Sequence, residues 1–446
     1  MSVGLERCPT EIIDSIAKCL DVIDAGSLRL ASRCLYSKAT AHLQKLEAVT
    51  RRDSLGCEIR DLALVGVVNN TKRLEANVRR WPGDAESQRH LEILQERQRE
   101  YEQSRDSGQI VRLLSAAFNN IAANTAAGKL HSLSLAVTVY RHDADHELPP
   151  IDGGSWRLIW QSAAETFRIV FAALRESQLQ LDELNLYNGS QLQRCSMAVD
   201  ELGSVGHSDP KLSQTLGAVR SLSISVSDRI LDLARDQQAS GDSADEISNY
   251  STDSDEDLER EEIMIKAHDP NNFTGLADLI GACRNLRHLS IHQYALDDQY
   301  MHRKCIFERG VAGLSTLPPI ETCSLSGVHL HDSDLISFLE KTSASLHALS
   351  MQTMTILEFR SLACFDYLAS GQSPHLDYLY LDDLSSLGTP IQFIGVGEPG
   401  VPVVASYGGN TLKREGKEEA QRPILYYLPR PGIGRWAAER QKQLRD

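Results

Sequence analysis

The sequence contains no convincing catalytic, nucleotide or metal motif. Residues 395–400 formally match G-x-G-x-x-G, but a β-rich stretch follows them instead of the helix that a nucleotide site needs. Its nine cysteines include no C-x-x-C pair, which argues against a zinc site and is typical of free thiols in a reducing compartment. Neither a P-loop nor a G-x-S-x-G motif is present, and no nucleophile is tied to a base. We therefore expect a protein that is not an enzyme and that holds no cofactor and no metal.

Long apolar runs and an excess of positive charge are also missing. The best short apolar run is residues 62–68, far below the roughly 18 residues that a membrane helix needs. The N-terminus has no basic start followed by an apolar stretch, so we expect no signal peptide. With 46 basic and 61 acidic residues, the net charge is −15, which argues against nucleic acid as a partner. These features favour an intracellular protein, cytoplasmic and/or nuclear.

One hexamer is repeated along the chain. It has apolar residues at positions 1, 4 and 6, and its seven copies are "LHSLSL" (130–135), "LDELNL" (181–186), "VRSLSI" (219–224), "LRHLSI" (286–291), "IETCSL" (320–325), "LHALSM" (346–351) and "LDYLYL" (376–381). Internal repeats of this kind indicate a protein built from stacked supersecondary units.

Amphipathic helices are predicted before several hexamers. Residues 110–121 place Ile110, Leu113, Leu114, Ala117, Phe118 and Ile121 on one helical face, and residues 163–174 do the same with Phe167, Val170, Phe171 and Leu174. Residues 276–280 and 334–341 are shorter versions. The predicted unit is helix, short link and strand, and no such unit covers its own apolar face, so neighbouring units have to stack.

This arrangement resembles the irregular form of the leucine-rich repeat family. The resemblance covers about residues 110–386 and implies an α/β fold in which the units form a solenoid. The alternative is an ordinary α/β domain with leucine-rich strands.

The strand period of two separates a core side from an outward side. If positions 4 and 6 point inward, positions 3, 5 and 7 point outward. Small hydroxyl residues fill most of the position-5 sites, as at Ser223 and Ser290. Larger outward residues give the predicted target-binding face, and they are Tyr187, His288, His292, Tyr378 and Tyr380. The alternative is a solvated sheet face with scattered aromatic residues.

Residues 1–50 form a different, helical module. The pattern L-x-x-x-P-x-E-I-I-x-x-I-x-x-x-L is followed by D-x-x-x-L-R-L-x-S-R. This pattern resembles an F-box of the kind common at the start of fungal proteins, which docks on a Skp-type adaptor. The resemblance assigns adaptor binding to Leu5, Pro9, Glu11, Ile12, Ile13, Ile16, Leu20, Leu28 and Leu30. The third-helix part, "YSKATAHLQKL", is only loosely typical, and the alternative is a helical cap on the first repeat.

Three further segments differ from the repeats. Residues 51–109 are predicted to form a solvated helical connector with a thin apolar stripe at Leu91 and Leu94. Residues 236–270 are predicted to be a disordered acidic insertion, since 240–262 hold ten acids and one arginine and so carry −9 of the net charge. Residues 387–446 are predicted to form a β-rich cap and tail, with short strands at 391–396, 401–407 and 423–429.

Phosphorylation candidates lie in the acidic insertion. Ser243, Thr252 and Ser254 each have an acidic residue three positions on, and phosphates there would add about −1.5 to −2 charges each. The alternative is a loop that only increases solubility.

Together these patterns favour a substrate-recognition subunit of a Skp–cullin–F-box ubiquitin ligase. The resemblance implies the adaptor and cullin complex as partners, and the repeats would hold an unidentified target protein. A leucine-rich-repeat scaffold without a ubiquitin-ligase role is the alternative function.

Overall fold

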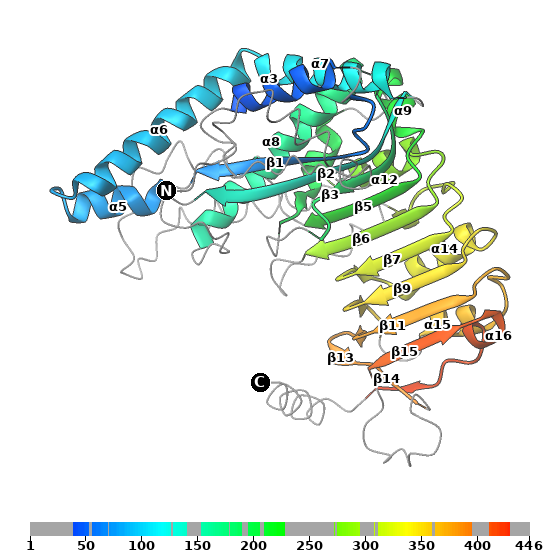
Figure 1. Ribbon diagram of the computed structural model, residues 1–446. Coiled ribbons are helices and arrows are strands. Elements are labelled where there is room, and N and C mark those ends of the chain that lie inside the picture. Colours follow the sequence, from blue (N-terminus) through cyan, green and yellow to red (C-terminus); the bar gives the residue numbers. More distant parts are fainter. Residues whose placement is uncertain are drawn as a thin grey trace, which may run out of the picture.

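The computed structural model describes residues 39–52, 56–69, 71–125, 128–140, 153–177, 179–189, 195–205, 209–227, 272, 274–294, 307, 311–358, 362–394 and 410–428. It is a mixed α/β structure whose centre is one ten-stranded, mostly parallel sheet (Figure 1). Along the sheet the order is β1 (Asp61–Asn69), β2 (Lys129–Tyr140), β3 (Gln180–Leu186), β5 (Ser221–Ser227), β6 (His288–Tyr294), β7 (Thr322–Ser326), β9 (Ala348–Gln352), β11 (Tyr378–Asp382) and β15 (Thr411–Glu415). The short β4 (Met197–Ala198) pairs with β5.

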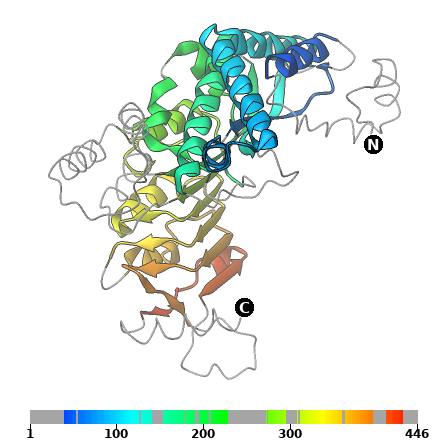
Figure 2. The ribbon, with the colours of Figure 1, turned by 90° about the vertical axis from the view of Figure 1, so that its left-hand side faces the viewer.

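Helices alternate with these strands along the chain. They are α3 (Ala39–Thr50), α5 (Lys72–Arg80), α6 (Ala85–Asp106), α7 (Gln109–Asn124), α8 (Gly153–Ser177), α9 (Pro210–Leu216), α12 (Thr274–Ala282), α14 (Asp332–Thr342), α15 (Ala363–Ala369) and α16 (Lys417–Ala420), with a 3-10 helix, η2, at Val199–Val205. Figures 1 and 2 show α8, α12, α14 and α15 along one face of the sheet. Over β5 to β11, the opposite face carries no helix among the described residues.

The seven predicted hexamers lie side by side and in register. Position 4 of the second copy, Leu184, is paired with Leu133 on one side and with Leu222 on the other. The same row continues through Leu289, Cys323, Leu349 and Leu379. All members of this row are 3% exposed or less, so the phase predicted from the period of two is correct along the whole row.

The predicted helix faces are also found in the core. On α7 the buried residues include Ile110, Leu114, Phe118 and Ile121, while Leu113 is half-buried. On α8 the side chains of Phe167, Val170, Phe171 and Leu174 are buried. Each helix covers the apolar side of the strands because its apolar stripe and the inward rows together exclude water.

The region predicted as a helical connector, residues 51–109, contains a strand as well. Residues 61–69 form β1, which pairs in parallel with β2, with Leu62 opposite Leu133 and Leu64 opposite Leu135. The helical interpretation was wrong there because the charged stretch that follows dominated the composition. The segment "IRDLAL", 59–64, has the apolar spacing of the other hexamers and is an eighth copy.

The rest of that region forms a helical hairpin, α5 and α6, which projects from the sheet (Figure 1). Its small core holds Leu74, Leu91 and Leu94, with Val78 packed against it. Asp84 caps α6 by accepting hydrogen bonds from the backbone N–H groups of Glu86 and Ser87. The apolar stripe predicted at Leu91 and Leu94 therefore packs against α5.

Three consecutive units share a turn that directly follows the strand. Gly327, Thr353 and Asp383 each have a positive φ, of 67°, 51° and 50°. After these turns the short strands β8 (His329–Leu330), β10 (Thr355–Ile356) and β12 (Ser385–Ser386) pair in parallel, and β13 (Thr389–Pro390) closes this second sheet. Gly327 is required at its turn, because a Cβ there would lie 2.2 Å from the Gln293 carbonyl oxygen.

The C-terminal segment confirms part of the predicted β-rich cap. Strands β14 (Gln392–Phe393) and β16 (Tyr426–Tyr427) fall within stretches predicted as strands and pair with each other. Strand β15, Thr411–Glu415, was not predicted and adds antiparallel to β11. Its sequence, "TLKRE", is charged because it ends the sheet and faces solvent. The predicted strand 401–407 lies outside the described residues.

Candidate functional site

The surface formed by the outward side chains of β5, β6, β7, β9 and β11 is the candidate binding site, and we refer to it as the outward face. From β5 to β9 its residues are Ser221, Ser223, His288, Ser290, His292, Thr322, Ser324, Ser326, Ala348, Ser350 and Gln352, and β11 contributes Tyr378, Tyr380 and Asp382. Ser225 lies on the same side of β5 but is buried. None of the β5–β9 residues is an Asp, Glu, Lys or Arg. The centre of the face is therefore polar but uncharged.

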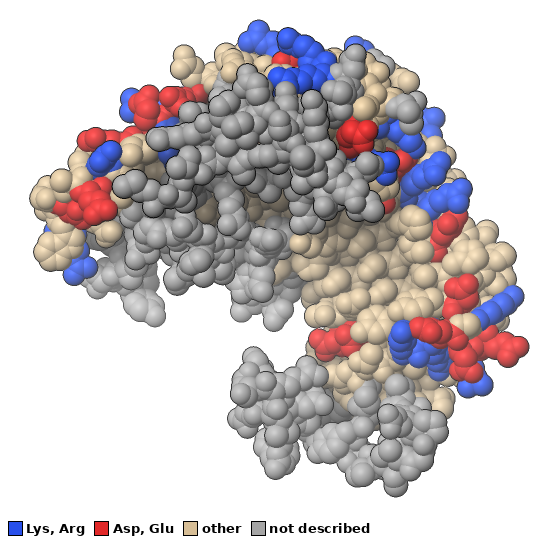
Figure 3. All heavy atoms as spheres, in the orientation of Figure 1, with Lys and Arg blue, Asp and Glu red and all other residues tan. Residues whose placement is uncertain are grey.

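Charged side chains lie instead where the strands begin. Arg287 and Glu321 form an ion pair with 2.7 Å between Nη1 and Oε1, and His347 Nδ1 lies 3.6 Å from Asp377 Oδ2. In Figure 3 the surface over β6, β7 and β9 is tan, and blue and red spheres gather along the border where the strands begin. A partner on the outward face would meet hydroxyl and amide groups first and charges only at the rim.

Asn188 crosses the outward face from the turn after β3. Its Nδ2 donates hydrogen bonds to Ser223 Oγ at 2.7 Å and to Ser290 Oγ at 3.0 Å. Its backbone N–H donates to Asn185 Oδ1, and Asn185 Nδ2 donates back to the Asn188 carbonyl oxygen, both at 3.0 Å. Because both serine oxygens accept from Asn188, both serine O–H groups keep a hydrogen to donate to a bound molecule.

Sequence reasoning missed Asn188. The signal that indicates it is the Asn-Gly pair directly after the "LDELNL" strand, since Asn-Gly is a strong turn signal. Gly189 has φ of 71°, and this turn brings the Asn188 side chain back over the neighbouring strands.

Two histidines of the predicted face lie where they were expected. His288 is exposed, and its Nδ1 is 2.8 Å from Thr322 Oγ1. His292 is half-buried, and its Nδ1 is 2.9 Å from Ser225 Oγ. Partial burial lowers the pKa of His292 below its ordinary value. This lowered pKa favours the neutral imidazole of His292 at neutral pH.

Tyr378 and Tyr380 lie at the β11 end of the outward face and are both half-buried. The Lys413 ammonium is 5.9 Å from the centre of the Tyr378 ring, a cation–π distance. Lys413 also pairs with Glu415, with 2.7 Å between Nζ and Oε1. Desolvation and the neighbouring Asp382 carboxylate raise the pKa of Tyr380, so its hydroxyl stays protonated. This end offers two aromatic rings with polar tips, which suit a protein contact.

Tyr187, the fifth residue predicted for the face, is on the other side of the sheet. It is 1% exposed, and its hydroxyl donates to the Ala163 carbonyl oxygen of α8 at 2.7 Å. The prediction was wrong because it continued the alternation of the strand by one residue. The backbone at Tyr187 is left-handed, with φ of 64°, and this turns the ring toward the core.

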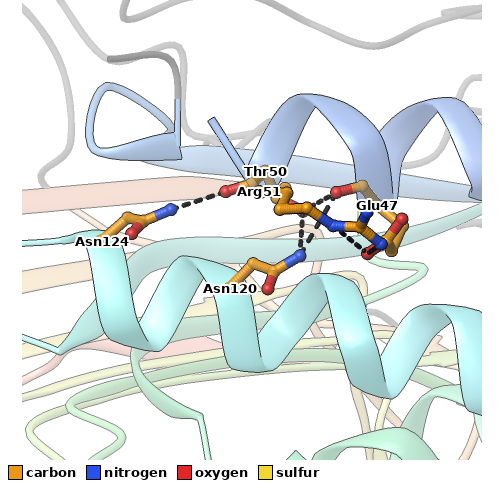
Figure 4. A network of polar contacts seen from close by, with 5 residues as sticks. All are labelled: Glu47, Thr50, Arg51, Asn120 and Asn124. Carbon is orange, nitrogen blue, oxygen red and sulfur yellow. Dashed lines mark hydrogen bonds and ion pairs between the residues drawn. The ribbon is translucent and has the colours of Figure 1, made fainter. Parts of the chain in front are cut away.

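Helix α3, within the predicted F-box-like module, is joined to the sheet domain. Leu46 is buried in the main core, and Leu43 packs against it. Figure 4 shows the polar contacts between α3 and α7. Asn120 Nδ2 donates to the Glu47 carbonyl oxygen at 3.2 Å, and Asn124 Nδ2 donates to the Thr50 carbonyl oxygen at 2.6 Å. These asparagines satisfy carbonyl groups at the end of α3.

The nine residues predicted to bind an adaptor, from Leu5 to Leu30, lie outside the described residues, and so do the phosphorylation candidates Ser243, Thr252 and Ser254. Within the described part of the chain, no group of three or more His, Cys, Asp and Glu side chains is placed to hold a metal ion. No helix in that same part is long and apolar enough to span a membrane.

Neither the protein-family models nor the curated proteins compared with this chain include a match. The functional proposal below therefore rests on the fold and on the outward face. Among the described residues, the arrangement of the face is suited to recognising a surface through hydrogen bonds and aromatic contacts.

Proposed function

We propose that this protein is a substrate-recognition subunit of a Skp–cullin–F-box ubiquitin ligase. In this proposal the F-box-like N-terminal segment binds a Skp-type adaptor. The sheet and its helices act as an irregular leucine-rich-repeat solenoid that holds a target protein on the outward face. The chemistry of ubiquitin transfer would belong to other subunits.

The observation that carries the proposal is the outward face itself. It is a broad row of hydroxyl, amide and imidazole groups without formal charge in its centre, and it ends at Tyr378 and Tyr380. Protein interfaces are depleted of charge in their centres and enriched in aromatic residues. A rigid sheet holds these groups in fixed positions, which reduces the entropy lost on binding.

The adaptor role is supported by the sequence pattern of residues 5–33. An isolated helical unit of that size rarely stabilises itself, and a partner that covers its apolar stripe supplies the missing burial. Ile12, Ile13 and Ile16 form the centre of that stripe. The Skp-type adaptor is the partner that the resemblance implies.

The alternative function is a leucine-rich-repeat scaffold without ubiquitin chemistry, and one observation favours it. Helix α3 packs on α7 and precedes β1, in the same order as the later helices and strands. Residues 39–46 of the loosely typical third part of the F-box pattern thus pack on the sheet domain. An N-terminal segment that only caps the first unit would contact this domain as well.

Co-purification of the full chain with a Skp-type adaptor separates the two functions. We expect a stable complex, and we expect Ile13→Asp to weaken adaptor binding at least tenfold, because it places an unpaired charge at an apolar contact. Asp14→Asn, in the next position, is the matched control and should bind like the wild type. A wild-type chain that does not bind the adaptor, or an Ile13→Asp variant that binds equally well, contradicts the ligase role and leaves the scaffold.

A further inference from the structure

Among the described residues, strand β1 has a hydrogen-bonded neighbour along one edge only. It forms one end of the ten-stranded sheet, and β2 is its neighbour. The Ser132 N–H donates to the Arg60 carbonyl oxygen at 3.0 Å. Because peptide groups point alternately to the two sides of a strand, those of the even-numbered residues from 62 to 68 face β2. The N–H and C=O groups of residues 63, 65 and 67 therefore point to the other edge.

No hydrogen bond reaches that other edge from the described residues. The edge runs over the nine residues of β1, and none of the residues from Leu62 to Val68 is charged. The opposite end of the sheet is finished differently, by the antiparallel strand β15 with Lys413, Arg414 and Glu415. Charged edge strands discourage pairing with another chain, whereas a long, apolar edge is a template for it.

The two sides of β1 define what fits beside it. On the helix side, α8 lies close, since a Cβ on Gly66 would meet Thr166 Oγ1 at 2.2 Å and Ser162 Oγ at 2.9 Å. On the outward side lie Ala63, Val65 and Val67, all half-buried. A strand added here meets small, uncharged side chains on the outward side, so it has to be uncharged and rich in small or β-branched residues itself.

We propose that the free edge of β1 docks an extended segment of a partner protein, which adds to the sheet as a further strand. Strand addition of this kind gives affinity through main-chain hydrogen bonds and selectivity through alternate side chains. The site is separate from the outward face, and it does not depend on the proposed ligase role.

A lone extended segment fits this edge more easily than a second copy of the chain. Neighbouring strands lie about 4.7–4.9 Å apart, whereas packed helices need about 8–10 Å between their axes. Because α8 contacts both β1 and β2, a second copy paired through its own β1 would have to pack its α8 directly against this α8. An extended peptide brings no helix with it.

Residue-resolved hydrogen exchange of the full chain tests the free edge directly. In the protein alone, we expect the amide hydrogens of Ala63, Val65 and Val67 to exchange at least ~100-fold faster than those of Leu64 and Gly66, which bond to β2. Adding a synthetic peptide of alternating valine and threonine, with a lysine at each end for solubility, should slow the three fast amides at least ~tenfold. Protection of these amides before any peptide is added would show that another part of this chain occupies the edge, and the proposal would be wrong.

Two substitutions separate strand addition from binding elsewhere. Val65→Pro removes an N–H that points to the free edge and spares the N–H groups that bond to β2. Edge strands tolerate proline at such a position. We expect it to weaken binding of the valine–threonine peptide at least ~tenfold. Val65→Thr keeps the N–H and should bind as the wild type does. Ala63→Pro repeats the test if Val65→Pro does not fold, and unchanged affinity in a folded proline variant overturns the proposal.

Discussion

The substitution Leu289→Ala tests whether the repeated hexamers form the core. Leu289 lies at position 4 of "LRHLSI", is 2% exposed, and stands between Leu222 on β5 and Cys323 on β7. Removing three carbon atoms from this position loses about 2–3 kcal/mol of transfer free energy, at ~0.8 kcal/mol per buried CH₂. A cavity that collapses only partly adds about 1 kcal/mol, at ~24 cal/mol per Å³. We therefore expect the free energy of unfolding to fall by about 3–4 kcal/mol.

The assay is urea unfolding of the full chain, followed by circular dichroism and by fluorescence. The matched control is His288→Ala, one residue earlier and exposed on the other side of the strand, which should change stability by less than about 0.5 kcal/mol. Equal losses in the two variants, or a loss below about 1 kcal/mol for Leu289→Ala, would refute the assignment of inward and outward positions.

Two further predictions concern a close approach and a titrating group. Gly56→Ala should lower the free energy of unfolding by about 1–3 kcal/mol, because its Cβ would lie 2.5 Å from the Thr50 carbonyl oxygen, whereas Gly83→Ala, with nothing within 4 Å, should be nearly neutral in urea unfolding. The lowered pKa of His292 means that the unfolded chain takes up a proton first as the pH falls through the ordinary value of 6.5, so acid should destabilise the wild type. The residues paired with His292 on the neighbouring strands, Ser225 and Ser326, do not titrate. His292→Gln should therefore lose less stability than the wild type between about pH 7.5 and pH 5.5. An equal loss in both proteins would contradict the assignment to His292.

The sequence predicts the interior of this protein better than its turns and ends. The hexamers and the helix faces are decided by burial over many residues, so Leu289 and Phe118 are in the core as expected. Strand β1 was missed because the charged helix after it outweighed a short apolar run. Tyr187 was misplaced because a single left-handed residue ends the alternation, and the Asn-Gly turn signal after it does not show on which side of the sheet the Tyr187 ring lies.

The candidate site was predicted only in part, because alternation along a strand is a local pattern and contacts from turns are not. The alternation correctly placed His288, His292, Tyr378 and Tyr380 on the outward face. It did not predict Asn188, because that side chain reaches the face from a turn and contacts serines 35 and 102 positions away. Contacts made across units depend on the packed fold, which the local sequence does not state.

Site-specific photocrosslinking in cells shows whether the outward face holds a target protein. A photoreactive residue would replace Ser324 or Ser350 on the outward face, or Asp278 or Glu340, which are exposed on α12 and α14. We predict that one and the same protein is crosslinked from Ser324 and Ser350, and that Tyr380→Ala weakens this adduct while the fold is retained. Adducts formed only from Asp278 and Glu340 would contradict it, because they would place the target on the helices.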